Sequence, residues 1–331
     1  SVQDAGISPA CVGDCETAID AASEPRPLPT CDVKAYGARG DGHTKDTAAI
    51  QAAIDACAPT GGVVSLHDGT FLSGTVKLAS SIVLDVAPTA TLLGSRDIAD
   101  YPDQSPPITN TQLGNCRKAL VYAEGAHDVA IRGGGTIDGN ARGVPAWNGS
   151  ATKEATRPMA IFTTMSSRVT IENVTVKDAA TWAVVNMEVD TLVVRDITVH
   201  SNLGPTHDGI DVVDGHHVLI EGATVDSGDD SICLKSGSKT GTKDVTVRNC
   251  HTTQSGVANG VKFGTASVGS FEDIVVEDTI IEHAQAAAMA VESVDGARIA
   301  NVKFRRIRVD DVGTPFFVLL GSRDRDPTRV G

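Results

Sequence analysis

Aromatic residues are scarce in this chain of 331 residues, at 4% of the sequence, and only Trp147 and Trp182 carry indole rings. A long platform on which sugar rings stack is therefore not expected. Basic residues are outnumbered, with 28 Lys and Arg against 42 Asp and Glu and a net charge of −14. Such a charge repels polyanions at long range, so we expect no nucleic-acid partner.

Long apolar runs are missing as well. No stretch reaches the ~18–20 apolar residues that cross a bilayer, so no membrane span is expected. The chain starts with Ser1-Val2-Gln3-Asp4, without a basic segment followed by an apolar one. We therefore expect that any export signal was removed or was never part of this chain.

The seven cysteines contain no Cys-x-x-Cys pair, so nothing points to a zinc site. Pairing of Cys31 with Cys57 would tie the first strand to a following helix, and Cys11 with Cys15 would close a small loop. Both pairs favour an oxidising setting, so we expect a secreted or extracytoplasmic protein, in a periplasm or at a cell surface. The alternative to a disulfide is a buried thiol that packs as a small apolar group. This alternative fits Cys233 and Cys250, which lie within strand patterns.

Internal repetition dominates what is present. Apolar segments of one pattern recur at intervals of 23 to 29 residues, with a weaker copy at Val129; they start at Val169, Leu192, Val218, Val245, Ile274 and Val302. Each copy alternates apolar and polar residues and is followed by turn residues, which predicts a half-buried strand and a turn. Strands repeating at this period predict an all-β fold, a parallel β-helix in which each coil is buried against its neighbours.

A second column of the repeat places acidic residues one above another. Aligning Asp208-Gly209-Ile210-Asp211-Val212 with Asp230-Ser231-Ile232-Cys233-Leu234 and Asn259-Gly260-Val261-Lys262-Phe263 gives steps of 22 and 29 residues. The column extends to Thr181 before these segments and to Ala287 and Thr314 after them. Because adjacent coils lie about 4.8 Å apart, we expect Asp208, Asp230 and Asn259 to stack, with Asp229 beside them.

Close carboxylates repel each other, which raises the pKa of at least one of them. A raised pKa keeps a proton available for donation, while a second carboxylate can activate water, as glycoside hydrolysis requires. The alternative is that these aspartates only solvate turns, where Asp is common.

At these residues the chain resembles glycoside hydrolase family 28, the polygalacturonase family, whose pattern is Asn-Thr-Asp, Asp-Asp, Gly-His-Gly and Arg-Ile-Lys. Asp208 matches the first Asp in a Thr-His-Asp variant, and Asp229-Asp230 match the pair. The segment from Tyr36 to Gly42, Gly61-Gly62 and Arg157-Pro158 also resemble family segments. The resemblance implies a right-handed parallel β-helix and hydrolysis with inversion. It further implies that Asp229 protonates the leaving oxygen while Asp208 and Asp230 activate water.

Two departures from the family pattern concern the substrate. Asn259 stands in place of the histidine, and Asn cannot take up a proton near neutral pH. Glu292, in Ala290-Val291-Glu292, stands where the lysine of Arg-Ile-Lys would bind a uronate carboxylate, which Glu would repel. Lys235 and Lys262 lie close to the column and are candidates to replace the missing basic pair; solvated lysines on an exposed sheet face are the alternative.

The substrate-binding candidates are Asn259, Lys262, Lys235, His207 and Trp182. His207 precedes Asp208 and is placed either on the cleft or on a surface loop. Trp182 lies one coil earlier, aligned with Gly209, where it either flanks the cleft or packs at the edge of the core.

Domain organisation follows from the repeats. Residues 1–30 are poor in periodic apolar residues and predict an extended N-terminal tail. Residues 31–331 predict one β-helix catalytic domain. After Thr44 and Asp46, an amphipathic helix is expected to cover its first end, through Ala48, Ile50, Ala53, Ile54 and Cys57. No such helix follows Pro315–Leu320, so the chain is shortened there or a partner covers the last coil.

The sequence thus predicts a monomeric hydrolase that cleaves a pectin backbone of the polygalacturonan or rhamnogalacturonan type, without cofactor or metal. One alternative is a polysaccharide lyase of the same fold, in which aspartates hold calcium and Arg or Lys acts as base. The other is a noncatalytic solenoid that binds carbohydrate or serves in adhesion.

Overall fold

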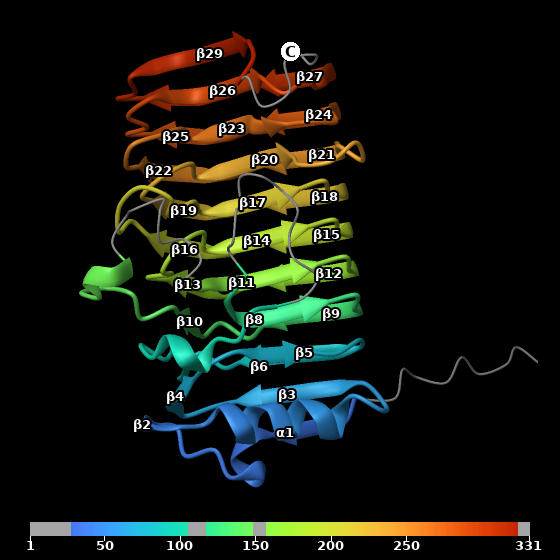
Figure 1. Cartoon of the computed structure of the whole chain (residues 1–331), viewed down its shortest axis with the longest axis vertical. Helices are drawn as coiled ribbons and strands as arrows, with labels where there is room; N and C mark the ends of the chain where they lie inside the picture. Colours follow the sequence, from blue (N-terminus) through green and yellow to red (C-terminus); the bar gives the residue numbers. More distant parts are fainter. Residues whose placement is uncertain (1–27, 105–116, 148–156, 324–331) are drawn as a thin grey trace, which may run out of the picture.

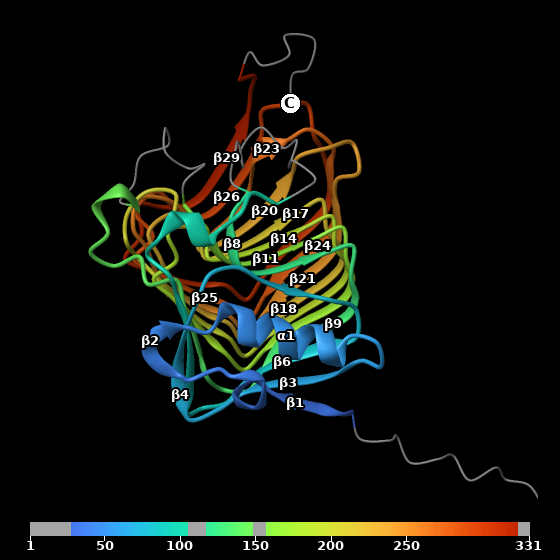
Figure 2. The same cartoon turned by 60° about the horizontal axis from the view of Figure 1, so that its bottom comes forward.

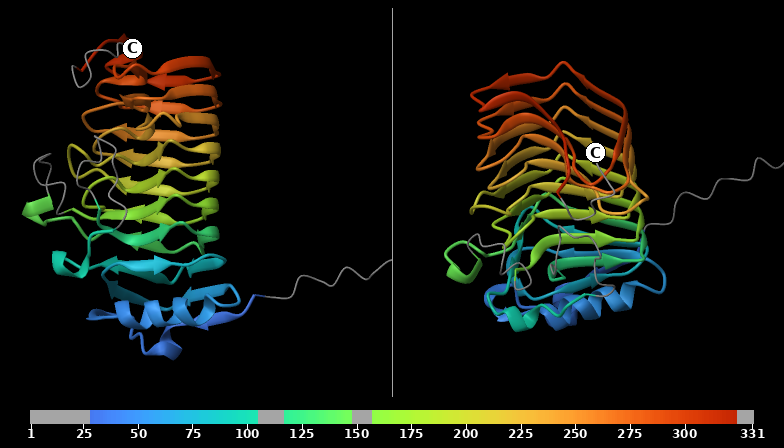
Figure 3. Two further views of the ribbon diagram at one scale, coloured as in Figure 1. Left: turned by 45° about the vertical axis from the view of Figure 1, so that its right-hand side comes forward. Right: turned by 45° about the horizontal axis from the view of Figure 1, so that its top comes forward.

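A computed structural model describes residues 28–104, 117–147 and 157–323. The chain winds into coils that stack along the long axis of the molecule, and each complete coil adds one strand to each of three parallel sheets (Figures 1 and 3). This arrangement is the predicted right-handed parallel β-helix.

The first sheet, sheet A, has ten strands. In order along the stack they are β1 (Thr30–Asp32), β3 (Gly62–Leu66), β6 (Ile82–Val86), β9 (His127–Arg132), β12 (Ser167–Glu172), β15 (Asp190–Arg195), β18 (His216–Glu221), β21 (Thr242–Arg248), β24 (Ser270–Glu277) and β27 (Arg298–Arg305). The repeat copies found in the sequence are these strands. Leu192 pairs with Val169 on one side and with Val218 on the other, so the repeat starts are stacked neighbours.

Sheets B and C complete each coil. The ten strands of sheet B are β2 (Asp41–Lys45), β4 (Gly69–Ser73), β7 (Ala90–Gly94), β10 (Thr136–Asp138), β13 (Thr175–Lys177), β16 (Thr198–Ser201), β19 (Thr224–Ser227), β22 (His251–Ser255), β25 (Ile280–Glu282) and β28 (Arg308–Asp310). The nine of sheet C are β5 (Val76–Leu78), β8 (Ala119–Glu124), β11 (Met159–Thr164), β14 (Val184–Met187), β17 (Ile210–Val213), β20 (Ile232–Ser236), β23 (Val261–Ser267), β26 (Ala287–Ser293) and β29 (Thr314–Leu320).

The turn residues after each strand of sheet A bend the chain sharply into sheet B. Asn173, Asp196, Gly222 and Asn249 occupy this corner in four successive coils with φ between 48° and 66°. Asn, Asp and Gly adopt such left-handed conformations at the lowest cost. The corner explains why all the repeat copies except the last are followed by one of these residue types; after β27 the position is Arg306, with φ of 54°.

The alternating apolar residues of sheet A fill the interior of the coils. Val169, Ile171, Leu192 and Val194 are all at most 1% exposed. The interior forms one continuous apolar cluster that reaches from the first coils to the last. Stacking identical positions of successive coils keeps this core closed over the length of the molecule, so the turns can vary to carry function.

The predicted register of the acidic column is confirmed from Asp208 onward. Ile210 pairs with Ile232, Ile232 with Val261, and Ala287 with Thr314. One position was wrong: Val184 pairs with Ile210, so Trp182, and not Thr181, lies opposite Asp208. Without a motif in the coil before Asp208, the spacing left this alignment ambiguous by one residue, and one residue is enough to reverse the side of the strand.

A helix covers the first end of the stack, as expected. Helix α1 (Thr47–Cys57) lies across the first coils (Figure 2) and buries Ile50, Ala53 and Ile54 completely. The Asp46 carboxylate accepts the backbone N–H groups of Arg39 and Gly40, at 2.7 and 3.0 Å, and so holds the loop that leads into the helix. The described residues also contain three short 3-10 helices, η1 (Val33–Tyr36), η2 (Ile98–Asp100) and η3 (Pro145–Trp147).

The predicted disulfide Cys31–Cys57 is present and ties β1 to α1. Cys233 and Cys250 are buried thiols, as expected. The proposed Cys11–Cys15 pair and all but the last three residues of the predicted tail lie outside the described residues. In the described part of the chain, no helix combines the length and apolarity that crossing a bilayer would take.

The last strand presents apolar side chains to solvent. Phe316, Val318 and Leu320 of β29 are 48%, 56% and 66% exposed. Figure 1 shows this strand at the end of the stack opposite α1.

Candidate active site

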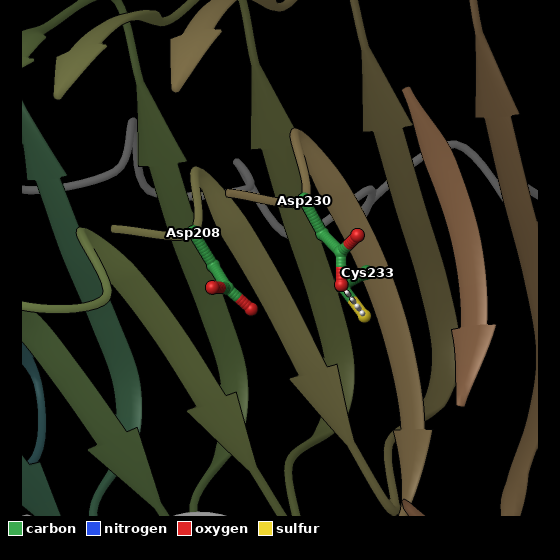
Figure 4. Close-up of side chains that lie close together, drawn as sticks. All are labelled: Asp208, Asp230 and Cys233. Atoms are coloured by element: carbon green, nitrogen blue, oxygen red, sulfur yellow. Dashed lines mark hydrogen bonds between the residues drawn. The ribbon is translucent and has the colours of Figure 1, made fainter. Parts of the chain in front are cut away.

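The acidic column lies in the turns that lead from sheet B to sheet C. Asp208 precedes β17, Asp229 and Asp230 precede β20, and Asn259 precedes β23. Figure 4 shows Asp208 and Asp230 projecting side by side from neighbouring coils. Ligand atoms of Asp208, Asp230 and Cys233 all lie within 4.8 Å of one another, so the two carboxylates form one buried acidic centre.

Asp229 is the most accessible of the three aspartates. One of its oxygens, Oδ2, accepts the Thr206 N–H at 2.8 Å, and the other, Oδ1, accepts the Asp230 N–H at 3.0 Å. The side chain is half-buried, whereas Asp208 and Asp230 are each 3% exposed. Asp229 therefore stands at the surface of the acidic centre with its carboxylate held by two backbone groups.

The turn that carries Asp229 depends on a glycine. A Cβ atom on Gly228 would lie 2.1 Å from the carbonyl oxygen of Gly204 in the neighbouring coil. Only glycine lets these two turns approach closely enough for Thr206 to reach Asp229.

Asp230 is held from the next coil. Its Oδ1 accepts both the backbone N–H of Asn259, at 3.1 Å, and the Asn259 amide Nδ2, at 2.7 Å. Its Oδ2 lies 3.2 Å from Lys262 Nζ, which in turn lies 3.8 Å from Glu292 Oε1. Asn259, which stands in place of the family's histidine, thus works as a hydrogen-bond donor to an aspartate.

Asp208 is held by Lys235. The Lys235 ammonium donates to Asp208 Oδ2 at 2.9 Å and also to Asp211 Oδ1, and it lies 4.1 Å from the centre of the Trp182 ring. All four side chains are buried. Asp211 was not among the predicted site residues. In the register of sheet C it lies opposite Cys233 and, one coil further, Lys262, which was already a candidate; this alignment was the available signal.

The electrostatics of this centre are set mainly by burial. Burial raises the pKa of Asp208 well above its usual range, and the nearby Lys235 charge opposes this rise. Burial likewise raises the pKa of Asp211 to about 6, against the same lysine. Repulsion between carboxylates adds to both shifts, as the sequence predicted, but it is the smaller cause.

The two lysines are not solvated side chains on an open sheet face. Lys235 is 2% exposed, and the Lys262 side chain is 12% exposed. Burial alone would lower the pKa of Lys262, but the charge of Asp230 holds that pKa above its usual value. Each ammonium is engaged by two carboxylates, so the solvated alternative was wrong.

His207 and the two tryptophans lie away from solvent. The His207 ring is fully buried and its Nδ1 lies 3.0 Å from the Gly204 carbonyl oxygen, so it supports the turn and has no surface on the cleft. Both expected placements of His207, on a surface loop and lining the cleft, were therefore wrong. Trp182 is 8% exposed beneath the Lys235 ammonium, and Trp147 is buried against Ala141 and Ala180.

The carboxylates of the acidic centre are better placed to bind lysine ammonium groups than a metal ion. Calcium prefers six to eight oxygen ligands. Here the oxygens of Asp208 and Asp230 already accept hydrogen bonds or ion pairs from Lys235, Lys262 and Asn259. The third group of the cluster, the Cys233 thiol, has a pKa raised by burial and therefore stays protonated.

A polar hollow also lies among the turns between sheets B and C nearer the end of the stack. It has a volume of about 470 Å³, and its lining includes Gln254, His283, Gln285 and Asp311. These residues lie in or beside the turns that precede β23, β26 and β29. Polar groups thus extend beyond the acidic centre over several coils.

Comparison with known proteins places this arrangement among carbohydrate-active enzymes. A family profile described as "Glycosyl hydrolases family 28" matches residues 58–329. An exo-poly-alpha-D-galacturonosidase of Dickeya chrysanthemi is 30% identical over 61% of this chain and 41% of its own length. A plasmin and fibronectin-binding protein A of Streptococcus pneumoniae is 37% identical over 44% of the chain and 20% of its own length.

Solved structures share the fold. The crystal structure of a hyperthermoactive exopolygalacturonase from Thermotoga maritima superposes with a TM-score of 0.70, at 23% identity, over 86% of this chain and 76% of that one. The chain spans less than half the length of each of the two curated relatives described above.

Proposed function

The chain belongs to glycosyl hydrolases family 28, and from that premise we propose that it hydrolyses glycosidic bonds in the backbone of pectic polysaccharides. The observation that carries the proposal is the buried acidic centre that Asp208 and Asp230 form from adjacent coils, with Asp229 beside Asp230 in the same turn. Three carboxylates at one place supply both the acid and the base that this chemistry needs.

In the proposed mechanism, Asp229 donates its proton to the glycosidic oxygen as the bond to the anomeric carbon breaks. A water molecule attacks that carbon from the opposite face and passes its proton to Asp208 or Asp230, and the configuration inverts. The accessibility of Asp229 supports the acid role, because the acid must reach the leaving oxygen. The burial of Asp208 and Asp230 beneath it suits groups that act on a small molecule such as water.

The charges of the site bear on the substrate. Five carboxylates face two lysines in the acidic centre and its rim; they are Asp208, Asp211, Asp229, Asp230 and Glu292. Both lysines are already paired, so neither ammonium is a ready partner for a uronate carboxylate. We therefore propose a neutral or mixed sugar unit at the cleavage point, as in rhamnogalacturonan, with polygalacturonan as the other candidate.

The disulfide Cys31–Cys57 supports a location outside the reducing cytoplasm, so we propose a secreted or extracytoplasmic enzyme. We further propose that it acts as a monomer and that residues 31–331 work as one catalytic domain.

The test is incubation with polygalacturonate, rhamnogalacturonan and neutral glycans, with the products identified by mass. Hydrolysis predicts saturated products with new reducing ends, formed equally with and without a chelator. Unsaturated products that disappear with chelator would identify a lyase. Binding to the glycan without any product would identify the noncatalytic solenoid. In parallel, Asp229→Asn should lose turnover by about 10²–10⁴-fold while its circular dichroism stays unchanged.

A further inference from the structure

Lys235 is the one cation bound directly to the proposed base Asp208 among the described residues. Its ammonium is enclosed on three sides, by Asp208 at 2.9 Å, by Asp211 and by the Trp182 ring at 4.1 Å. With 2% exposure, Lys235 has almost no surface with which to touch a substrate. This placement differs from the role of carboxylate clamp that its position in the sequence suggested.

Asp208 needs such a partner because of where it lies. A carboxylate with 3% exposure loses most of its solvation by water and is driven toward its neutral form. A neutral carboxyl group cannot take a proton from water. The charge that compensates for the lost water must therefore come from a neighbour with good hydrogen-bond geometry.

Asp211 fixes the lysine in turn. It projects from β17, three residues after Asp208, and is completely buried. Held between two carboxylates of one strand segment, the Lys235 ammonium cannot swing toward the cleft. The remaining charged or titratable groups close to Asp208 are Cys233 of β20 and the pair Asp229 and Asp230 before β20.

We propose that Lys235, anchored by Asp211, is a positioning residue that favours the charged form of Asp208 against the effect of burial and holds it in a fixed orientation for accepting a proton from water. This inference rests on the proposed function, since it assigns Asp208 a base role. It separates the two lysines of the site: Lys235 serves the base, while Lys262, which is more exposed, faces the rim and Glu292.

The experiment measures kcat/KM against pH on whichever glycan the wild-type chain cleaves. The base is active only when deprotonated, so activity falls below the pKa of Asp208. Lys235→Met removes the compensating charge, and its acidic limb should move up by on the order of one pH unit. Asp211→Asn removes a repelling charge and leaves Lys235 to Asp208 alone, so its acidic limb should move down. The double variant should lie between the two.

Lys243→Met is the matched control. Lys243 is 40% exposed on β21, 3.7 Å from Glu272, and takes no part in the site, so its pH profile should match the wild type. A merely structural role for Lys235 predicts lower kcat or a lower melting temperature without any shift of the acidic limb. Unshifted limbs in folded Lys235→Met and Asp211→Asn would overturn the inference.

The test gives a clear answer even if Lys235→Met does not fold or the wild-type chain is inactive. If Lys235→Met does not fold, the direction of the Asp211→Asn shift decides alone: a downward shift supports the inference, and no shift or an upward one overturns it. The carboxyl carbon-13 signal of Asp208, assigned by its loss in Asp208→Asn, should titrate in the same direction as the acidic limb. A wild-type chain that cleaves nothing in the panel would instead overturn the proposed function, an outcome distinct from an active enzyme with unshifted limbs.

Discussion

At the scale of single residues, Glu292 sets the charge at the rim of the proposed site. Its carboxylate lies 3.8 Å from Lys262 Nζ and neutralises the more exposed of the two lysines. In the family pattern this position carries a lysine, so one residue reverses the local charge. We therefore expect the substrate preference to depend on Glu292, which pairs with Lys262 and with none of the three aspartates.

Glu292→Gln should raise kcat/KM for polygalacturonate, mainly through a lower KM, because a carboxylate that repels uronates is lost and Lys262 becomes available to bind one. We expect a gain of about tenfold, equivalent to about 1.4 kcal/mol. Kinetics on polygalacturonate and rhamnogalacturonan check this result. Glu282→Gln, which changes a carboxylate of β25 paired with His251, is the control and should change neither substrate. An unchanged or higher KM for polygalacturonate would show that Glu292 does not set the charge preference.

The sequence identified the three aspartates because they sit in short motifs, but it could not assign partners to the lysines. In the sequence alone, a lysine whose partner lies on another coil cannot be told from one whose partner lies at either end of its own strand. Lys235 belongs with Asp208 and Asp211 because its long side chain runs back along the strand to the turn. Burial of a charged pair depends on neighbours from three coils, which a local pattern does not contain.

At the scale of elements, the turns between sheets B and C carry the acidic centre, and their close stacking sets its geometry. Gly228 packs against the backbone of Gly204, and this contact aligns the turn of Asp229 with the turn of Thr206. The register of sheet C could be predicted from Asp208 onward because the segments Asp-Gly-Ile-Asp and Asp-Ser-Ile-Cys share a pattern. The predicted register was wrong by one residue in the coil of Trp182, because that coil contains no motif to align.

Gly228→Ala should destabilise the fold by about 1–3 kcal/mol and reduce activity more than its stability loss explains, because the new methyl group would push the two turns apart. Urea unfolding and kcat measured well below the melting temperature check the two effects. Gly321→Ala is the control, since a Cβ there meets its nearest neighbour at an ordinary 3.6 Å. Normal activity in a stable Gly228→Ala variant would contradict the role of this close approach.

The cap helix makes a second prediction at this scale. The disulfide joins residues 26 apart and fastens α1 to β1. The double variant Cys31→Ala and Cys57→Ala should lose about 2–4 kcal/mol of unfolding free energy. Activity at low temperature should persist, because the acidic centre lies many coils away from α1 (Figure 1). Loss of activity in the folded double variant would show that the cap communicates with the site.

At the scale of the whole molecule, stacking converts a repeat in the sequence into a column in space. The period, the alternation and the turn residues were enough to predict the β-helix, because each coil contacts only its neighbours. The same property brings polar turn residues of successive coils together, as Gln254, His283 and Asp311 do around the hollow near the end of the stack. What the period could not predict is which side chains become buried, since burial depends on how the coils and loops pack around each position.

We propose that Asp208, Asp229 and Asp230 act together to add water to a glycosidic bond. Cleavage of the preferred glycan in water enriched in heavy oxygen, followed by mass spectrometry of the products, measures this addition. We expect every new reducing end formed by the wild-type chain to carry one heavy oxygen and Asp229→Asn to form almost no labelled product. Unlabelled products with a new double bond, or label formed at wild-type rates by Asp229→Asn, would contradict it.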